Sequence, residues 1–91
     1  PSFVDGIGSP EVFPEMFELA RELLAGSLVA ELEEIEEAVR LLAGRARVVA
    51  EGAGATPLAV AASGAAGTGK VVCVVSGGNI DTATLATILG G

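Results

Sequence analysis

Histidine, tryptophan and tyrosine are absent from this 91-residue chain, and cysteine occurs once, at Cys73. One cysteine cannot form an internal disulfide, and without histidine the thiol has no partner of the kind that binds zinc. The sequence therefore predicts no metal site. A single thiol with no disulfide framework also favours a reducing, cytoplasmic setting.

Basic residues are also few, with five Lys and Arg against twelve Asp and Glu and a formal net charge of −7. Such a charge repels the phosphate backbone of nucleic acids and anionic membrane surfaces. No apolar run reaches the ~20 residues of a membrane span, and the first residues lack the features of a signal peptide. We expect neither nucleic acid nor a membrane as a partner.

Small aliphatic residues dominate what is present. Hydrophobic residues make up 51% of the chain although only 3% are aromatic, and there are 13 glycines. This composition is typical of closely packed helices and buried strands. At this length we expect residues 1–91 to form a single small domain.

The apolar spacing predicts four helices. The first contains the stripe from Phe13 to Leu24, with Pro10 or Pro14 near its start and Gly26 as its C-terminal cap. The second, over about 33–46, starts with glutamates and ends with arginines, as the helix dipole favours. Its acidic run is interpreted as a solvated face in preference to a metal or basic-partner site.

The remaining two helices follow a change to small residues. One is expected from about residue 54 or 56 to 65, with Thr56 as N-cap and Pro57 at the first helical position. The other runs through residues 85–89 after a cap at Asn79 or Asp81.

Three segments are predicted to be extended. They are Ser27 to Glu31, the entry at residues 48–49, and the β-branched run K-V-V-C-V-V at residues 70–75. The predicted order is helix, strand, helix, helix, strand, helix. We therefore expect an α/β fold, with a partial open parallel sheet and a helical crossover.

Residues 64–71, G-A-A-G-T-G-K-V, nearly spell a phosphate-binding P-loop. Val71 lacks the hydroxyl that would hold the metal, and the motif precedes a predicted strand when it should follow one. We interpret Gly67 to Gly69 as the turn between a helix and the last predicted strand.

The S-G-G-N sequence at residues 76–79 follows the predicted strand 70–75. The carboxyl end of a strand in an open α/β sheet is where ligands bind, and glycines there allow a flat ring to approach the backbone. The alternative is a plain turn between strand and helix, and spacing alone does not decide between the two.

Three motifs, in order and spacing, resemble the closing segment of threonine dehydratases and serine racemases, which are fold-type II pyridoxal-phosphate enzymes. They are V-D-G-I near the start, R-V-V-A-E-G-A-G-A, and S-G-G-N-I-D about 25 residues after its glutamate. The resemblance covers essentially the whole chain. It implies that residues 1–91 are the C-terminal part of the large domain of a serine/threonine dehydratase, a lyase that forms a 2-oxo acid and ammonia.

The resemblance also implies a set of cofactor-binding residues and no catalytic ones. In that family the serine of S-G-G-N lies against the pyridine nitrogen, and its glycines leave the ring edge free. The acid of A-E-G-A-G-A lies near the ring, although a solvated loop acid is the alternative here, and V-D-G-I closes the other side. The corresponding residues are Ser76, Gly77, Gly78, Glu51, Asp5 and Gly6.

Two parts of such an enzyme are not in this sequence: the Schiff-base lysine in its motif and the glycine-rich loop that holds the cofactor phosphate. The single lysine, Lys70, begins the predicted strand at the end opposite Ser76. The intact family uses pyridoxal phosphate, but we expect this chain alone to bind none and to be inactive. Its expected partner is a second copy, as a homodimer, or the missing N-terminal portion of the enzyme. A stand-alone, non-catalytic oligomeric binding or scaffold protein is the alternative.

Overall fold

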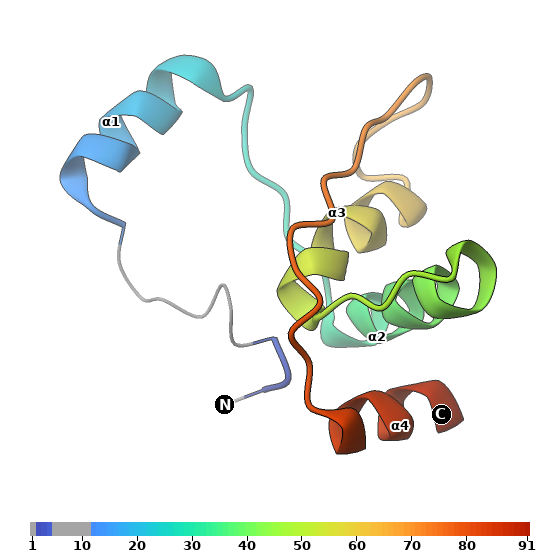
Figure 1. The fold of residues 1–91 in the computed structure, drawn as a ribbon. Helices are drawn as coiled ribbons and strands as arrows, with labels where there is room; N and C mark the ends of the chain where they lie inside the picture. The colour runs from blue at the N-terminus through green and yellow to red at the C-terminus, as the bar shows by residue number, and fades with distance from the viewer. Residues whose placement is uncertain (1, 5–11) are drawn as a thin grey trace.

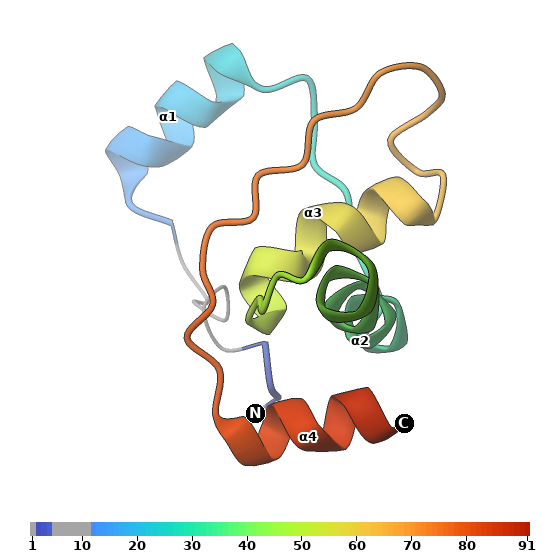
Figure 2. The same ribbon diagram turned by 45° about the vertical axis from the view of Figure 1, so that its right-hand side comes forward.

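The structure, a computed structural model, describes residues 2–4 and 12–91 of the chain (Figure 1). The described residues form four α-helices and one π-helical turn, in the order α1 (Pro14–Leu23), α2 (Leu32–Leu41), η1 (Leu42–Ala46), α3 (Gly52–Ala62) and α4 (Thr82–Gly90). All four predicted helices are present. Figures 1 and 2 show α2 between α3 and α4, with α1 apart from the other three.

Helix α1 begins with Pro14, whose fixed backbone angle suits the first helical position. It ends at Leu23 because Leu24 is extended, with φ −90° and ψ 140°. The predicted cap at Gly26 is wrong, since the helix has ended before that residue. None of the α1 residues is buried, so its apolar stripe is uncovered.

Helix α2 begins with a capping box, in which the Glu31 backbone N–H donates to Glu34 Oε1 at 2.8 Å. Its buried face consists of Ile35, Ala38 and Val39. The apolar spacing also predicts Leu42 and Ala46 on this face, but Leu42 is half-buried and Ala46 is exposed. The π-helical turn η1 extends it to Ala46, and Arg47 then reverses the chain with a left-handed φ of 58°.

Helix α3 starts earlier than predicted. Glu51 is its N-cap, so Thr56 and Pro57 lie inside the helix and not at its start. The Thr56 hydroxyl donates to the Gly52 carbonyl at 2.8 Å, which gives it a partner within the helix. Helix α4 begins after Asp81, one of the two predicted caps.

The core is thin and lies where α3 and α4 pack on α2. Its buried side chains are small, and the largest that is fully buried belongs to Val39. The radius of gyration is 13.9 Å, against about 12 Å for a compact chain of this length. The buried residues are Val4, Ile35, Ala38, Val39, Ala50, Ala55, Ala59 and Ile88.

The predicted α/β fold with a parallel sheet is wrong for the described residues, which contain no strand. The segments predicted as strands are irregular or extended but do not pair with one another in a ladder. In the run 70–75, Val72 and Val74 are 91% and 69% exposed. A strand exists only with a partner at the right spacing, and the described residues place no extended segment alongside the run.

The glycine-rich, P-loop-like segment follows α3. Residues 63–66 form a turn, earlier than the predicted Gly67 to Gly69, where the chain bends at residues 68–69; Gly64, Gly67 and Gly69 all have positive φ. In the part of the chain that the structure describes, no helix is long and apolar enough to cross a membrane.

Candidate cofactor-binding site

The N-cap and first turn of α3, with the residues just before them, lie against Gly77 and Gly78, which come much later in the chain. The Glu51 backbone N–H donates to the Gly77 carbonyl at 3.0 Å. Because Glu51 is the N-cap of α3, this bond connects the first turn of that helix to the segment S-G-G-N. Two motifs that are distant in sequence therefore meet.

Glycine is required for this close approach. A Cβ on Gly54 would lie 2.5 Å from the Gly77 carbonyl oxygen, and one on Gly78 would lie 2.6 Å from the Val49 carbonyl oxygen. Real Cβ atoms do not come so close to a backbone oxygen. A Cβ on Gly77 would meet Glu51 Oε1, so the Glu51 carboxylate lies directly over the Gly77 Cα.

The N-terminal segment packs on the other side of the same helical turn. A Cβ on Gly52 would lie 2.7 Å from Val4 Cγ2 and 3.0 Å from two ring carbons of Phe3. Val4 belongs to the core. Asp5 and Gly6, which the resemblance assigns to the cofactor site, lie outside the described residues, so their expected place in the site stays a prediction.

Ser76 begins the segment and is exposed. Its hydroxyl has no hydrogen-bond partner among the described residues, whereas the next residue, Gly77, is held by Glu51. Glu51 is half-buried, and its side chain does not cap α3. The arrangement thus offers the Ser76 hydroxyl and the Glu51 carboxylate. The backbone hydrogen bond from Glu51 to Gly77 holds the two segments together.

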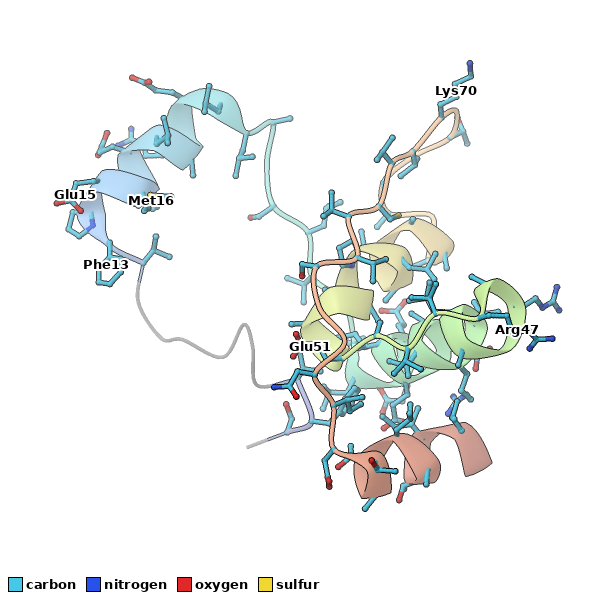
Figure 3. All side chains as sticks on the ribbon, viewed as in Figure 1. Phe13, Glu15, Met16, Arg47, Glu51 and Lys70 are labelled. Carbon is cyan, nitrogen blue, oxygen red and sulfur yellow. The ribbon has the colours of Figure 1, made fainter. Side chains whose placement is uncertain are left out.

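Lys70 lies away from these groups. Figure 3 shows it at the tip of the loop that follows α3, pointing outward, with Glu51 near the opposite end of that helix. The structure therefore agrees with the prediction that this lysine is remote from Ser76. No group of three or more His, Cys, Asp or Glu side chains in residues 2–4 and 12–91 is placed to hold a metal ion.

Sequence reasoning assigned roles to Glu51, Gly77 and Gly78 but none to Gly52 or Gly54. The signal was present in the alternation A-E-G-A-G-A, because glycines two residues apart on a helix start leave backbone open on nearly opposite sides. What the pattern did not show is which segment fills each opening.

Residues 1–77 match the family described as "Pyridoxal-phosphate dependent enzyme". The chain belongs to this family. The matched range ends at Gly77, so it includes both Glu51 and Ser76.

Several relatives of this chain are named for threonine chemistry. An L-threonine ammonia-lyase from Geobacter sulfurreducens is 37% identical over 90 residues, which is 97% of this chain and 22% of the relative. One from Thermotoga maritima is 39% identical over 82 residues, covering 89% of this chain and 20% of the relative. A catabolic L-threonine dehydratase from Staphylococcus aureus is 34% identical over 80 residues, covering 82% of this chain and 23% of the relative.

The chain spans about a fifth of the length of these curated relatives. No solved structure matches it.

The described residues fit one edge of pyridoxal phosphate and not the whole cofactor. Ser76 supplies a neutral hydroxyl with no competing partner among the described residues, beside Gly77 and Gly78, whose Cβ positions are taken up by the Glu51 carboxylate and the Val49 carbonyl. The cofactor phosphate and aldehyde need other groups, and Lys70 lies at the far end of the loop. The residues present therefore suit the ring-nitrogen side of the site.

Proposed function

We propose that this chain is a segment of a pyridoxal-phosphate-dependent dehydratase that converts serine or threonine into a 2-oxo acid and ammonia. The observation that carries the proposal is the hydrogen bond from Glu51 N–H to the Gly77 carbonyl. It holds the backbone next to Ser76 against the motif A-E-G-A-G-A. Relatives named L-threonine ammonia-lyase over most of this chain support the same chemistry.

In this proposal Ser76 accepts or donates a hydrogen bond at the pyridine nitrogen of the cofactor. When bound, pyridoxal phosphate supplies the electron sink for bond cleavage in the amino acid. A neutral hydroxyl, unlike a carboxylate, does not hold a proton on the ring nitrogen. Gly77 and Gly78 keep the ring edge free of side chains. Glu51, over the Gly77 Cα, forms the polar wall next to Ser76, and the family resemblance assigns Asp5 and Gly6 to the same site.

The chain by itself is proposed to be inactive, because nothing in it corresponds to the covalent lysine or the phosphate loop. It would act in the cytoplasm together with the rest of the enzyme. Many large apolar side chains are exposed, among them Phe13 at 77% and Val72 at 91%, which supports the need for a covering partner. A second copy, in a non-catalytic oligomer, is the competing explanation of the same exposure.

The test compares two serines in the enzyme that carries this segment. Ser76→Ala should lower kcat roughly tenfold, since losing one hydrogen bond in the transition state is worth about 1.4 kcal/mol. Ser27→Ala is the matched control, because Ser27 is also exposed and has no hydrogen bond to another described residue. Its kcat should stay within twofold of the parent. Both are measured by the rate of 2-oxo acid formation.

Equal turnover in the parent and in Ser76→Ala would overturn the role of Ser76. The isolated 91-residue chain, mixed with pyridoxal phosphate and threonine, should form no 2-oxo acid. Turnover by the isolated chain that is lost on Lys70→Ala would overturn the proposed inactivity. The mass of the native protein also separates the explanations, since one free chain of 91 residues would favour the non-catalytic oligomer.

A further inference from the structure

Arg40 connects two helices that are far apart in sequence. It lies near the end of α2, and its Nη1 donates to the carbonyl oxygen of Ile88 in α4 at 2.8 Å. Its Nε donates to Glu37 Oε2 at 3.0 Å, one turn earlier on α2. The Arg40 side chain is 28% exposed, whereas that of Arg21, which makes a similar ion pair with Glu18, is 64% exposed.

The bond matters because of where it meets α4. The last four carbonyls of an α-helix lack the regular donor four residues on, and the C-terminus carries a partial negative charge that a cation stabilises. The Gly91 N–H reaches the Ile88 oxygen only at 3.3 Å, so Arg40 supplies the shorter bond and the charge from another helix. Among the described residues, no other side-chain hydrogen bond joins α4 to another helix.

The chain leads directly from α4 back to Ser76. Asp81 is the N-cap of α4, and the Ile80 N–H donates to the Gly78 carbonyl at 3.0 Å. Residues 76–81 are therefore held from two sides: at Gly77 by Glu51, and beyond Asp81 by a helix that Arg40 and the buried Ile88 fix to α2.

We propose that Arg40 is a positioning residue for Ser76. By fixing the C-terminal end of α4 to α2, it sets the place where that helix starts and hence the direction in which the S-G-G-N backbone presents the Ser76 hydroxyl. This inference rests on the proposed function, because the consequence of misplacing Ser76 is weaker binding at the cofactor ring. Arg40 itself touches neither cofactor nor substrate in this proposal.

The experiment uses the enzyme that carries this segment, freed of cofactor and titrated with pyridoxal phosphate while its visible absorption is recorded. Arg40→Ala should weaken cofactor binding roughly tenfold, as expected from a charged hydrogen bond, and should shift the absorption maximum in the same direction as Ser76→Ala. Arg40→Lys, which keeps the charge and a donor, should restore most of the affinity. Arg21→Ala is the matched control, since Arg21 has the same type of ion pair and no bond to another helix, and should leave both readings unchanged.

The outcomes separate the two proposals. If Ser76→Ala weakens binding but Arg40→Ala stays within twofold of the parent, the positioning role is overturned and the proposed function stands. If neither variant changes affinity or absorption, the role of Ser76 at the cofactor fails, and the positioning role fails with it. Should Arg40→Ala lose its helical circular dichroism, Arg40→Gln, which keeps the helix but not the charge, takes its place: weaker cofactor binding by folded Arg40→Gln supports the positioning role, and binding equal to the parent overturns it.

Discussion

Gly52 and Gly54 near the start of α3, like Gly77 and Gly78, leave no room for a side chain, whereas Gly44 does. Gly54 is buried, and a Cβ there would lie 2.5 Å from the Gly77 carbonyl oxygen and 3.0 Å from its nitrogen. Gly44, in the turn η1, has nothing within 4 Å of the same position and does not have a positive φ. Comparing substitutions at Gly54 and Gly44 therefore measures how much the close packing of α3 against Gly77 contributes to stability.

We predict that Gly54→Ala destabilises the chain by about 1 to 3 kcal/mol, the usual cost of forcing an extra methyl group into a packed site. The two backbones must separate, which breaks the bond from Glu51 N–H to Gly77 O. Gly44→Ala should be neutral or should stabilise by up to about 1 kcal/mol, since alanine favours helical backbone over glycine. Urea unfolding followed by circular dichroism measures both, and equal midpoints for the two variants would contradict the prediction.

At the scale of elements, the two helical prolines have opposite consequences. Pro14 begins α1, where its missing N–H has no partner in any case. Pro57 lies in the interior of α3, so the Ala53 carbonyl has no i+4 donor and the ring crowds the preceding turn. Among the helices that pack together, α3 is therefore the one that an interior proline destabilises.

We predict that Pro57→Ala stabilises the chain by about 2 kcal/mol. An interior proline costs about 3 kcal/mol in a helix, and the entropy regained by the unfolded chain offsets about 0.4 to 1 kcal/mol of the gain. Pro14→Ala should instead leave the unfolding midpoint unchanged or slightly lower. The same urea titration decides the outcome, and a lower midpoint for Pro57→Ala would show that α3 depends on the rigid ring for its packing.

At the scale of the whole molecule, exposed apolar surface exceeds what the small core covers. In the run 70–75 the backbone is extended without a paired segment, and Val72 is 91% exposed. Helix α1 and the residue before it add Phe13, Met16 and Phe17, all at least half exposed. Unpaired extended backbone with β-branched side chains recruits another chain. The net charge of −7 opposes association, but salt screens it over about 10 Å.

We predict that the isolated chain self-associates, and that the run 70–75 is the contact. Light scattering over a dilution series should show a dimer, the commonest symmetric assembly. Val72→Lys should shift the equilibrium toward monomer, because a lysine on an unpaired edge discourages pairing. Val29→Lys is the control, since Val29 is 87% exposed in a connecting segment and the charge change is identical. A folded, cooperative monomer of the parent at low micromolar concentration would rule the idea out.

The sequence by itself determined the local features of this protein. The glutamates at the start of α2 and its closing arginines depend on interactions within a few residues, as do the two candidate prolines for the start of α1 and the two candidate caps of α4, between which the structure selects Pro14 and Asp81. The motifs around Glu51 and Ser76 also indicated the family without any tertiary contact, because they stand in a fixed order along the chain.

Tertiary structure decided the rest. The sheet expected from the run 70–75 does not form in the described residues, because a β-branched sequence favours an extended backbone but cannot supply the partner strand that pairing requires. The site depends likewise on distant contacts: Glu51 with Gly77, Gly52 with Val4, and Arg40 with Ile88. None of these pairs follows from local periodicity, because each is set by how α3 and α4 pack on α2.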